Sequence, residues 1–447
     1  MKQSQFNLFF EDKGTSRFVI FNAKSTALAV ISEKEMELYK KLFSSNFEYT
    51  NQEEKDFLQE LKKGQFVFDD NENEIEVLKY LQKSAQFSKN SLSLTIAPTM
   101  ACNFGCVYCY QGEHNEAKKM SKDVQESIVK FVKSRIRKIN HLSITWYGGE
   151  PLLAIDVIEN LTNEFLKLCK ENNVSYYSSI ITNGYFFTKE VAQKLRDFNV
   201  STVQITIDGP KEYHDSKRPL KNGGGTFDTI IANLIATKGI FPNKISLRIN
   251  TDQYNQDKVK DVIEILKQNN LENDVYPYLG HVDATNDFYD DEKCLTTEKF
   301  ADIRESFQKE MCCEQSAMAE YPRVKFNACL ADSEGYVVDP NGDLTKCWCD
   351  IGHDEYCVGN IIKGDTKFKR LIEYFNYDVF SDPKCKNCSI IPICMGGCPR
   401  RRIDKGHTIC ASAKKMINNN VVAAAKEKDK TLQSLEPTQI NFGIVNG

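Results

Sequence analysis

LSLTIAPTMACNFGCVYCY, residues 92–110, is the stretch that decides the fold of this chain. It begins with an apolar, β-branched run that has the length of a buried strand. Directly after that run, Cys102, Cys106 and Cys109 stand in the spacing CxxxCxxC. Three thiolates in such a loop can ligate three irons of a 4Fe-4S cluster and leave the fourth iron open to a substrate or cofactor. A structural zinc site is the alternative, but it needs four closed ligands and this loop supplies three.

Five more strand-like runs follow, and segments of helical length separate them. This alternation predicts a parallel sheet with helices packed outside, hence an α/β fold. Six units are too few for a closed eight-stranded barrel, so we expect a partial (β/α)6 barrel or an open sheet. In either architecture the chemistry lies at the C-terminal ends of the strands. The six runs are residues 92–99, 142–149, 176–184, 201–209, 244–251 and 274–280.

The composition indicates a globular protein with metal or thiol chemistry. Of the 447 residues, 41% are hydrophobic and 27% are charged, which is enough for several cores. Fifty-eight Lys and Arg against 62 Asp and Glu give a net charge of -4, so neither nucleic acid nor a membrane is an expected partner. No signal peptide or spanning segment is seen, so a cytoplasmic location is expected. In a reducing compartment, the 16 cysteines favour metal sites or catalysis over disulfides.

The first 90 residues carry no cysteine and follow a different pattern. Two aromatic and β-branched runs around Lys13 and Gly14 predict a hairpin, and amphipathic stretches predict helices over 33–44 and 52–63. We interpret residues 1–90 as a small winged-helix-like α+β module. DNA binding is disfavoured because the module lacks a basic recognition face.

A second group of cysteines fills a late segment with few apolar residues, which bound metal would help to order. Zinc is a rival to iron there, because sites of four cysteines are common in zinc proteins. The grouped cysteines are Cys329, Cys347, Cys385, Cys388, Cys394, Cys398 and Cys410. Four cysteines outside the groups are expected to be small buried hydrophobes, namely Cys169, Cys294, Cys312 and Cys313.

The cysteine loop and a glycine motif together resemble the radical S-adenosylmethionine (SAM) enzymes. Tyr108 precedes the third cysteine, as an aromatic does in their cluster-binding signature, and GGEP at 148–151 follows the next strand. The resemblance implies that the backbone of Gly148 and Gly149 and the carboxylate of Glu150 hold the amino group of SAM, and a carboxylate does pair with an ammonium. Polar residues at later strand ends are expected to bind the rest of SAM, although each also suits a turn or a helix cap. These residues are Thr182, Asn183, Thr206, Asp208, Arg218 and Asn250.

The second cysteine group resembles the SPASM domain, an extension of radical SAM enzymes that carries auxiliary iron-sulfur clusters. The resemblance implies one auxiliary cluster with four cysteine ligands and another that is one ligand short. Cys349 or Cys357 is expected to complete the second, or the position stays open for a substrate thiolate or another ligand. The first ligand set is Cys385, Cys388, Cys394 and Cys410, and the second is Cys329, Cys347 and Cys398.

Asp350 is a candidate catalytic residue. A carboxylate beside an auxiliary cluster can deprotonate a substrate, and in the sulfatase-maturating members an aspartate directly follows the cysteine that corresponds to Cys347. Here the aspartate lies further along the chain, so a solvated loop aspartate is an equally good interpretation.

The resemblance implies an oxidoreductase that uses SAM and three 4Fe-4S clusters, one SAM-binding and two auxiliary. Cleavage of SAM gives a 5'-deoxyadenosyl radical, which abstracts hydrogen from an unactivated carbon inside a closed pocket. Flavodoxin or ferredoxin is the expected electron donor.

Family members with a SPASM domain mostly modify peptides or proteins. We therefore expect a ribosomal-peptide (RiPP) maturase that installs a thioether or carbon-carbon cross-link, with residues 1–90 binding the precursor's leader by strand addition. An anaerobic sulfatase-maturating enzyme that forms formylglycine from Cys or Ser is the alternative. A non-catalytic iron-sulfur or zinc scaffold is a third, and it leaves the GGEP segment unexplained. The expected domains are the module at 1–90, the core at 91–320, the cysteine-rich domain at 321–430 and a tail at 431–447.

Overall fold

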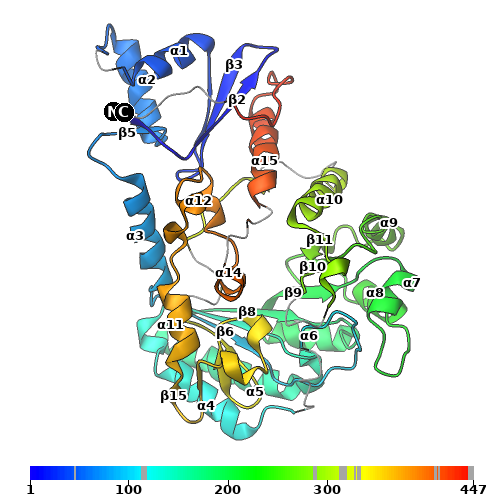
Figure 1. The fold of residues 1–447 in the computed structure, drawn as a ribbon. Helices are drawn as coiled ribbons and strands as arrows, with labels where there is room; N and C mark the ends of the chain where they lie inside the picture. Colours follow the sequence, from blue (N-terminus) through cyan, green and yellow to red (C-terminus); the bar gives the residue numbers. More distant parts are fainter. Residues whose placement is uncertain are drawn as a thin grey trace. The chain divides into compact units, whose positions relative to one another are not determined.

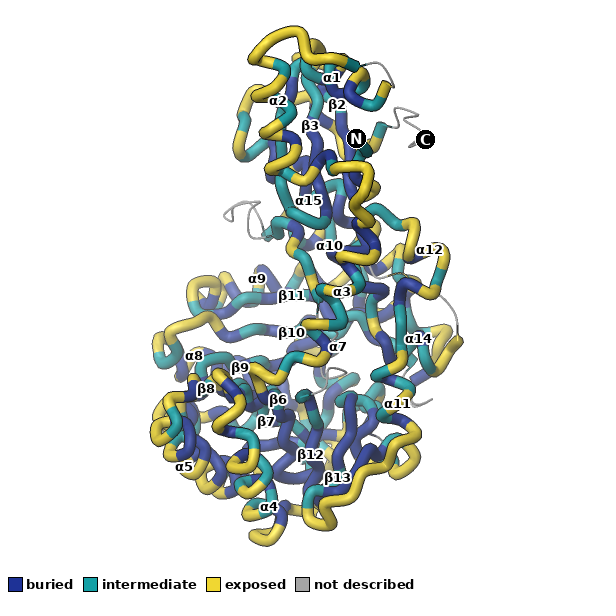
Figure 2. The backbone as a smooth tube through the Cα atoms, turned by 90° about the vertical axis from the view of Figure 1, so that its left-hand side faces the viewer, coloured by how far each residue is buried: buried dark blue, intermediate teal, exposed yellow. Residues whose placement is uncertain are grey.

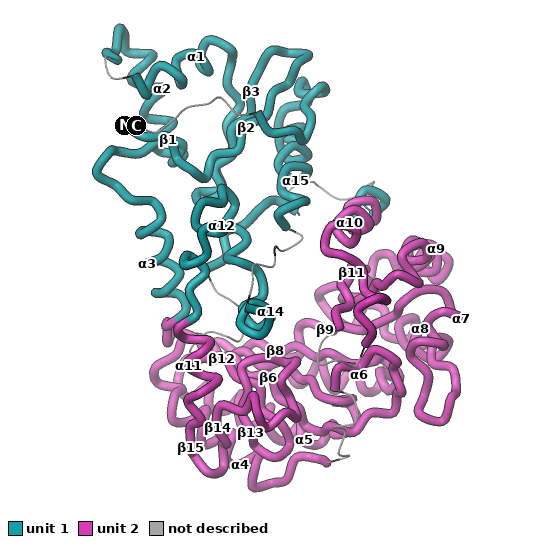
Figure 3. The backbone as a smooth tube through the Cα atoms, viewed as in Figure 1, with its two compact units in different colours: residues 1–86, 308–328, 377–447 teal, residues 87–307, 329–376 magenta. Residues whose placement is uncertain are grey.

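The computed structural model describes residues 1–44, 47–111, 118–284, 289–311, 320–326, 329, 334–406, 410 and 413–440. The chain forms two compact units, which are described one at a time (Figure 3). Unit 1 comprises residues 1–86, 308–328 and 377–447, and unit 2 comprises residues 87–307 and 329–376. No helix in the described ranges has the length and the apolar character needed to cross a membrane.

Unit 2 is built on a sheet of ten strands, of which six are parallel neighbours in chain order (Figure 1). Apolar side chains alternate along these strands with more accessible ones, as Leu92 and Leu94 do in the first of them. The predicted α/β fold with a large parallel sheet is confirmed. The six strands are β6 (Ser91–Ile96), β7 (His141–Trp146), β8 (Ser175–Ile181), β9 (Val200–Thr206), β10 (Ile245–Thr251) and β11 (Val275–His281).

Amphipathic helices connect the parallel strands or follow the last strands of the sheet. The longest connecting helix buries Val157, Leu161 and Phe165, which recur at helical spacing on one face. Figure 2 shows the strands as largely buried and the outer turns of the helices as exposed. The helices are α4 (Lys122–Lys133), α5 (Ile155–Asn172), α6 (Lys189–Asp197), α7 (Lys211–Lys217), α8 (Phe227–Ala236), α9 (Asp261–Gln268), α10 (Thr297–Met311) and α11 (Phe368–Asn376).

A later segment of the chain extends the same sheet beyond β6. The first of its strands pairs in parallel with β6, from Gly335 opposite Ser93 to Val338 opposite Ile96. Three short antiparallel strands continue outward, so the edge of β6 is covered by paired backbone. Residues 329–376 thus belong to the unit of the core, although the sequence analysis placed them with the late cysteines. The strands are β12 (Gly335–Val338), β13 (Asp343–Thr345), β14 (Gly359–Asn360) and β15 (Asp365–Thr366).

Unit 1 begins with the predicted hairpin, which turns between Asp12 and Arg17 and is joined by a third antiparallel strand. The two predicted helices follow, each capped at its start by a side chain, that of Ser32 or of Asn51. The elements are β1 (Lys2–Gln3), β2 (Asn7–Asp12), β3 (Arg17–Asn22), β4 (Leu28–Ile31), α1 (Glu33–Lys41), α2 (Gln52–Lys63), β5 (Val67–Phe68), α3 (Glu74–Gln86), α12 (Pro383–Lys386), α13 (Ile391–Cys394), α14 (Pro399–Lys405) and α15 (Ala413–Lys428).

The N-terminal strands and the late cysteine segment share one hydrophobic core within unit 1. Phe6, Phe10 and Phe21 pack in the same cluster as Ile391 and Val421. The strands of the N-terminal segment therefore pack against residues from the other end of the chain, and a winged-helix-like module over residues 1–90 stays a prediction.

Candidate active site

The cysteine loop follows β6 and is fixed by backbone hydrogen bonds to a segment far along the chain. Residues 103–107 run beside residues 217–221, which begin at the last residue of α7, and Gly105 N–H donates to the Pro219 carbonyl at 2.8 Å. Phe104 and Leu220 form an antiparallel bridge in the same stretch. The segment after α7 thus shapes the loop that carries the cysteines.

Cys102, Cys106 and Cys109 are half-buried and close enough for their charges to act on one another. Burial is the main cause that raises the pKa of Cys102 and raises that of Cys106 to about 12, while Arg218 lowers both. Among the described residues, no three His, Cys, Asp or Glu side chains converge to hold a single metal ion. A 4Fe-4S cluster needs a different arrangement, because each cysteine binds a different iron atom of the cluster. Three neighbouring thiols in one loop fit such a cluster.

Both glycines of the GGEP segment are required by the close approach of the cysteine loop. A Cβ at Gly149 would lie 2.3 Å from the Ala101 carbonyl oxygen, and a Cβ at Gly148 would lie 2.4 Å from that of Thr99. Hydrogen bonds hold this contact, with Gly149 N–H donating to Thr99 O at 3.1 Å and Glu150 N–H to Ala101 O at 2.8 Å. The GGEP segment and the start of the cysteine loop therefore continue the backbone pairing of β6 and β7 beyond the ends of these strands.

The Glu150 carboxylate is fully buried at the centre of a hydrogen-bond network. It accepts bonds from the Thr182 hydroxyl at 2.7 Å, the Asn183 backbone N–H at 2.7 Å and the Leu152 N–H at 3.0 Å. Burial raises its pKa, while these hydrogen bonds lower it. The Asn183 side chain donates to Asn103 at 2.8 Å and approaches the Cys102 sulfur at 3.9 Å. The ends of β7 and β8 and the cysteine loop thus meet at this carboxylate. The structure brings together Glu150, Thr182 and Asn183, three of the residues predicted from the sequence to bind SAM.

Tyr108 is the hub of a second network, which joins the remaining expected site residues except Thr206. Its hydroxyl donates to Asp208 and accepts bonds from Arg218 at 2.8 Å and from the Asn250 amide at 2.9 Å. Burial raises the pKa of Asp208 although the Arg218 charge lowers it. The buried Nε of Arg218 has no hydrogen-bond partner among the described atoms. Thr206 ends β9 opposite Arg248.

His214 is also buried in this region and serves the local structure. Its Nδ1 accepts the Asp208 backbone N–H at 3.2 Å, and its Nε2 lies 3.1 Å from the Thr226 hydroxyl. Burial lowers its pKa far below the usual value, so the imidazole is neutral.

Arg248 lies on the same strand as Asn250, and its position in the sequence also predicted a binding role for it. Its Nε donates to the Asn250 side chain at 2.7 Å, and its guanidinium lies against Gly280, where a Cβ would meet it at 2.5 Å. Its charge lowers the pKa of Tyr147 and of Asp208. The spacing Arg-x-Asn along β10 puts both side chains on one face of the sheet.

A cavity of about 520 Å³ opens beside the cysteine loop, at the ends of β9, β10 and β11. Lys217 stands on its wall, with its ammonium 3.2 Å from Asp252 and 3.1 Å from the Tyr289 hydroxyl. The Tyr289 ring packs edge-on against Tyr108, with centroids 6.1 Å apart, so the cavity adjoins the Tyr108 network. The lining residues are Val107, Tyr213, Ser216, Lys217, Tyr254, Tyr289, Asp290 and Lys293.

Asp350 is fully buried, so the interpretation as a solvated loop aspartate is wrong. Its carboxylate accepts a hydrogen bond from the Tyr374 hydroxyl at 3.3 Å and lies 4.0 Å from the Arg370 guanidinium. A catalytic role for Asp350 stays a prediction. Beside it in the chain, the thiols of Cys347 and Cys349 are in hydrogen-bond contact, which raises the pKa of Cys347.

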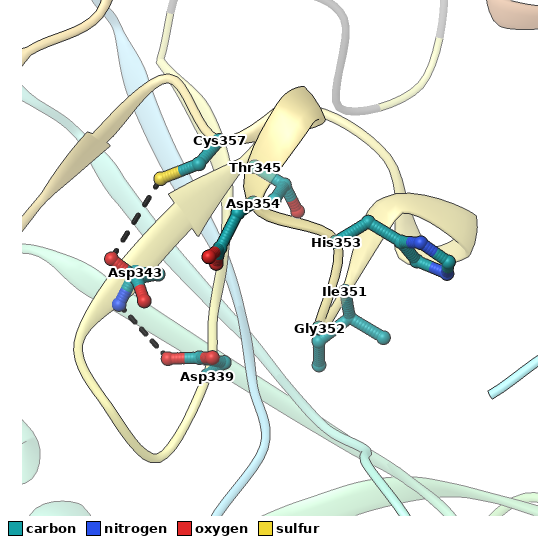
Figure 4. A pocket seen from close by; sticks show the side chains of 8 residues that line it. All are labelled: Asp339, Asp343, Thr345, Ile351, Gly352, His353, Asp354 and Cys357. Atoms are coloured by element: carbon teal, nitrogen blue, oxygen red, sulfur yellow. Dashed lines mark hydrogen bonds between the residues drawn. The ribbon is translucent and has the colours of Figure 1, made fainter. Parts of the chain in front are cut away.

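Cys357 lies in a different place, on the wall of a small cavity of about 10 Å³ (Figure 4). Its thiol donates to the Gly359 carbonyl at 2.9 Å and approaches Asp343 at 3.7 Å. Burial raises the pKa of Asp339 in the same cavity to about 6. The lining residues are Asp339, Asp343, Thr345, Ile351, Gly352, His353, Asp354 and Cys357.

Unit 1 holds the other late cysteines. Cys385 is buried, and the Arg402 guanidinium donates to its sulfur at 3.1 Å. Cys388 and Cys394 pack on the same hydrophobic core. Cys398 and Cys410 are exposed, and so is Cys329 of unit 2. The predicted grouping of these cysteines into two clusters stays a prediction.

Of the cysteines expected to be buried hydrophobes, Cys169 is buried in α5 and Cys294 is partly exposed. Cys312 and Cys313 lie outside the described residues.

Comparison with known proteins assigns the central part of the chain. Residues 96–287 match the Radical SAM superfamily. The chain is 26% identical over 384 residues to the cysteine-type anaerobic sulfatase-maturating enzyme of Clostridium novyi (strain NT), covering 74% of this chain and 96% of that enzyme. It is 22% identical to the radical SAM cyclopropyl synthase TigE of Paramaledivibacter caminithermalis, covering 78% of this chain and 77% of TigE. Streptococcus suis SuiB, solved bound to its precursor peptide SuiA, aligns with a TM-score of 0.53 at 15% identity over 92% of this chain and 98% of SuiB.

Proposed function

Because residues 96–287 form a radical SAM domain, the chain is a radical SAM enzyme, and we propose that it is a maturase that cross-links a ribosomally made precursor peptide. The domain implies SAM and a 4Fe-4S cluster, which when bound supply hydrogen-atom abstraction from an unactivated carbon. We assign the ligation of that cluster to Cys102, Cys106 and Cys109. The proposal includes two auxiliary clusters on the late cysteines and an electron donor such as flavodoxin or ferredoxin.

The residues around the cysteine loop offer complementary groups to each part of SAM. A carboxylate has about four acceptor positions, and Glu150 uses three on protein donors, which leaves one for the amino group of SAM. Arg218 offers its buried Nε to a carboxylate or a ribose oxygen. The three tyrosine rings on the cavity wall suit a flat adenine ring.

The maturase proposal depends on how much of the chain aligns with each relative. The sulfatase-maturating relative accounts for 74% of this chain, whereas the likeness to SuiB, solved with a precursor peptide, extends over 92%. A likeness over most of the chain to a protein solved with its precursor peptide supports a maturase that docks a peptide.

The three-stranded sheet of unit 1 offers an edge for such docking. Its outer strand β4 pairs only with β3 among the described strands. The opposite edge, on β2, already contacts the end of the chain, where Asp12 bridges to Leu435 and Ile440 N–H donates to Phe9 O at 3.0 Å. We therefore propose that a leader segment adds to β4, since an extended peptide gains affinity from backbone hydrogen bonds at a sheet edge.

A sulfatase-maturating activity is the second candidate. The observation that favours it is the alignment with 96% of the length of the Clostridium novyi enzyme. On this alternative the substrate is a short sulfatase segment, and docking on β4 has no part in the reaction.

Mass spectrometry of peptides separates the two candidates. The chain is co-expressed with candidate precursors or incubated anaerobically with them, SAM and a reductant. A loss of two hydrogens from a leader-bearing precursor, abolished when the leader is removed, supports the maturase. Conversion of Cys or Ser to formylglycine in a sulfatase peptide, with no dependence on a leader, refutes it in favour of the alternative.

A further inference from the structure

Arg248 carries a positive charge that no carboxylate of the described residues meets at ion-pair distance. The residue lies on β10 and is half-buried. Within the described part of the chain, the Nε atom has a hydrogen-bond partner, the Asn250 side chain at 2.7 Å, and the two terminal nitrogens have none. A charge that is partly withdrawn from water and left unpaired costs free energy, and a bound anion recovers it.

The neighbouring network contains fewer carboxylates than guanidinium groups. Asp208 accepts hydrogen bonds from the Tyr108 hydroxyl and, at 3.0 Å, from the Asn250 backbone N–H. Arg218 donates to the same Tyr108 hydroxyl at 2.8 Å. Two guanidinium groups thus stand around one buried carboxylate, and that carboxylate is already engaged by other donors. A further negative charge is therefore favoured beside Arg248.

The guanidinium of Arg248 is held in a fixed place on its face of the sheet. Asn250 anchors it on one side, and it lies against Gly280, where a Cβ would meet Cζ and Nε at 2.5 Å. On the neighbouring strands, the Tyr278 hydroxyl donates to Gln204 at 2.6 Å, a hydrogen bond that spans β10. A guanidinium that is positioned before the ligand arrives loses little entropy on binding.

We propose that Arg248 binds a carboxylate of the peptide substrate with its two terminal nitrogens. The planar fork of a guanidinium matches the two oxygens of a carboxylate. Asn250 contacts both Arg248 and Tyr108 of the cysteine loop, so the bound carboxylate lies close to the reacting residue of the substrate. The inference rests on the proposed function, because it takes the substrate to be a peptide.

Three carboxylates share this chemistry: an acidic side chain of the peptide, its free C-terminus and the carboxylate of SAM. SAM has a single carboxylate, and the buried Nε of Arg218 is available to it. The substrate is therefore the source that we assign to Arg248, and Arg248 selects substrates with an acidic side chain or a free C-terminus at this position.

Peptide binding without turnover tests the assignment. The full chain is reconstituted anaerobically, saturated with SAM and kept without a reductant, and ligand-observed NMR titrations compare two pairs of acetylated alanine peptides. One pair has an amidated C-terminus and carries glutamate or glutamine at its centre, and the other has a free or an amidated C-terminus. We expect the parent to bind the carboxylate member of at least one pair about tenfold more tightly, because a hydrogen bond to a charged group is lost in the other member. We expect Arg248→Gln to bind both members of that pair equally.

Two controls separate binding from a structural role. Glutamine keeps an N–H donor for Asn250, and Arg137→Gln removes the charge of an exposed arginine of the same unit and should keep the discrimination. We also expect Arg248→Gln to unfold at the same or a higher urea concentration than the parent, because the unpaired charge is removed. A lower midpoint indicates a structural role and overturns the inference.

The titrations give further results that would overturn it. These are a parent that binds both members of each pair equally, and an Arg248→Gln protein that still discriminates. Weaker binding of SAM by Arg248→Gln, with unchanged discrimination between the peptides, would assign the guanidinium to SAM. The titration involves no turnover, so its outcome is read separately from the mass spectrometry that tests the proposed function.

Discussion

Replacing Gly149 by alanine should separate the GGEP segment from the cysteine loop. The new Cβ would lie 2.3 Å from the Ala101 carbonyl oxygen and 2.4 Å from that of Met100, and both neighbours are backbone. A backbone cannot rotate away as a side chain can, so the two segments must move apart. The movement strains the hydrogen bonds from Gly149 to Thr99 and from Glu150 to Ala101.

The expected loss in the free energy of unfolding is about 2–4 kcal/mol. Overpacking at a buried contact costs about 1–3 kcal/mol, and each weakened backbone hydrogen bond adds about 0.5–1.5 kcal/mol. The smaller entropy of the unfolded alanine chain returns about 0.4–1 kcal/mol. We also expect a reduced iron content, because the displaced loop carries Cys102.

Urea unfolding followed by tryptophan fluorescence measures this loss in unit 2. The two tryptophans of the chain, Trp146 and Trp348, both belong to that unit. Gly105→Ala is the matched control, because its Cβ would meet nothing closer than the Lys221 Cα at 3.8 Å. A Gly149→Ala protein with the stability and iron content of the parent would refute the proposed close contact.

Three further predictions follow from the site. Tyr108→Phe should weaken SAM binding and lower the free energy of unfolding by about 1–3 kcal/mol, because it leaves buried groups such as the Asp208 carboxylate without their hydrogen-bond partner. Calorimetric titration with SAM measures the binding, and urea unfolding measures the stability. The pKa of Asp339 is raised by burial to about 6, so its contribution to stability is present at low pH and is lost as the pH rises from about 4 to about 6. Asp339→Asn should therefore be about 1–3 kcal/mol more stable than the parent at pH 7.5 and equal to it near pH 4, as measured by urea unfolding at both values, and a constant gap would contradict the assignment. Cys102→Ala should abolish formation of 5'-deoxyadenosine from SAM, whereas Cys394→Ala should keep some and lose modification of the peptide; equal losses in a chromatographic assay of both products would indicate a purely structural role for Cys394.

The chemistry that lies within short stretches of sequence could be predicted, and the non-local pairing could not. The cysteine spacing and the strand-helix alternation are local patterns, and they gave the parallel sheet and the loop at its edge. The pairing of Gly335 with Ser93 joins strands far apart in the chain, so no hydrophobic periodicity in the sequence indicated that residues 335–366 extend the sheet. Which strands become neighbours depends on side-chain packing in the folded sheet, and the sequence of one strand alone does not show its partner.

The same limit explains what was missed in the site. The sequence analysis expected Tyr108, Asp208 and Arg218 near one ligand, and the structure joins them directly to one another. Hydrogen bonds between side chains depend on distances of a few tenths of an ångström, which sequence position does not fix. Asp350 shows the reverse case: a solvated loop aspartate was one of its two interpretations, and the residue lies fully buried beside Tyr374.

The antiparallel pairing of residues 103–107 with residues 217–221 sets an order of events during synthesis. The cysteines emerge from the ribosome long before the segment that shapes their loop, and a chain made from its N-terminus cannot form that pairing earlier. The nascent protein therefore exposes three unshaped thiols while β7, β8 and β9 are being made. We expect ribosome-bound chains stalled before residue 217 to react with thiol reagents at Cys102, and chains released beyond unit 2 to be protected. If these cysteines hold the cluster of the proposed function, their ligand geometry is complete only after the sheet has folded.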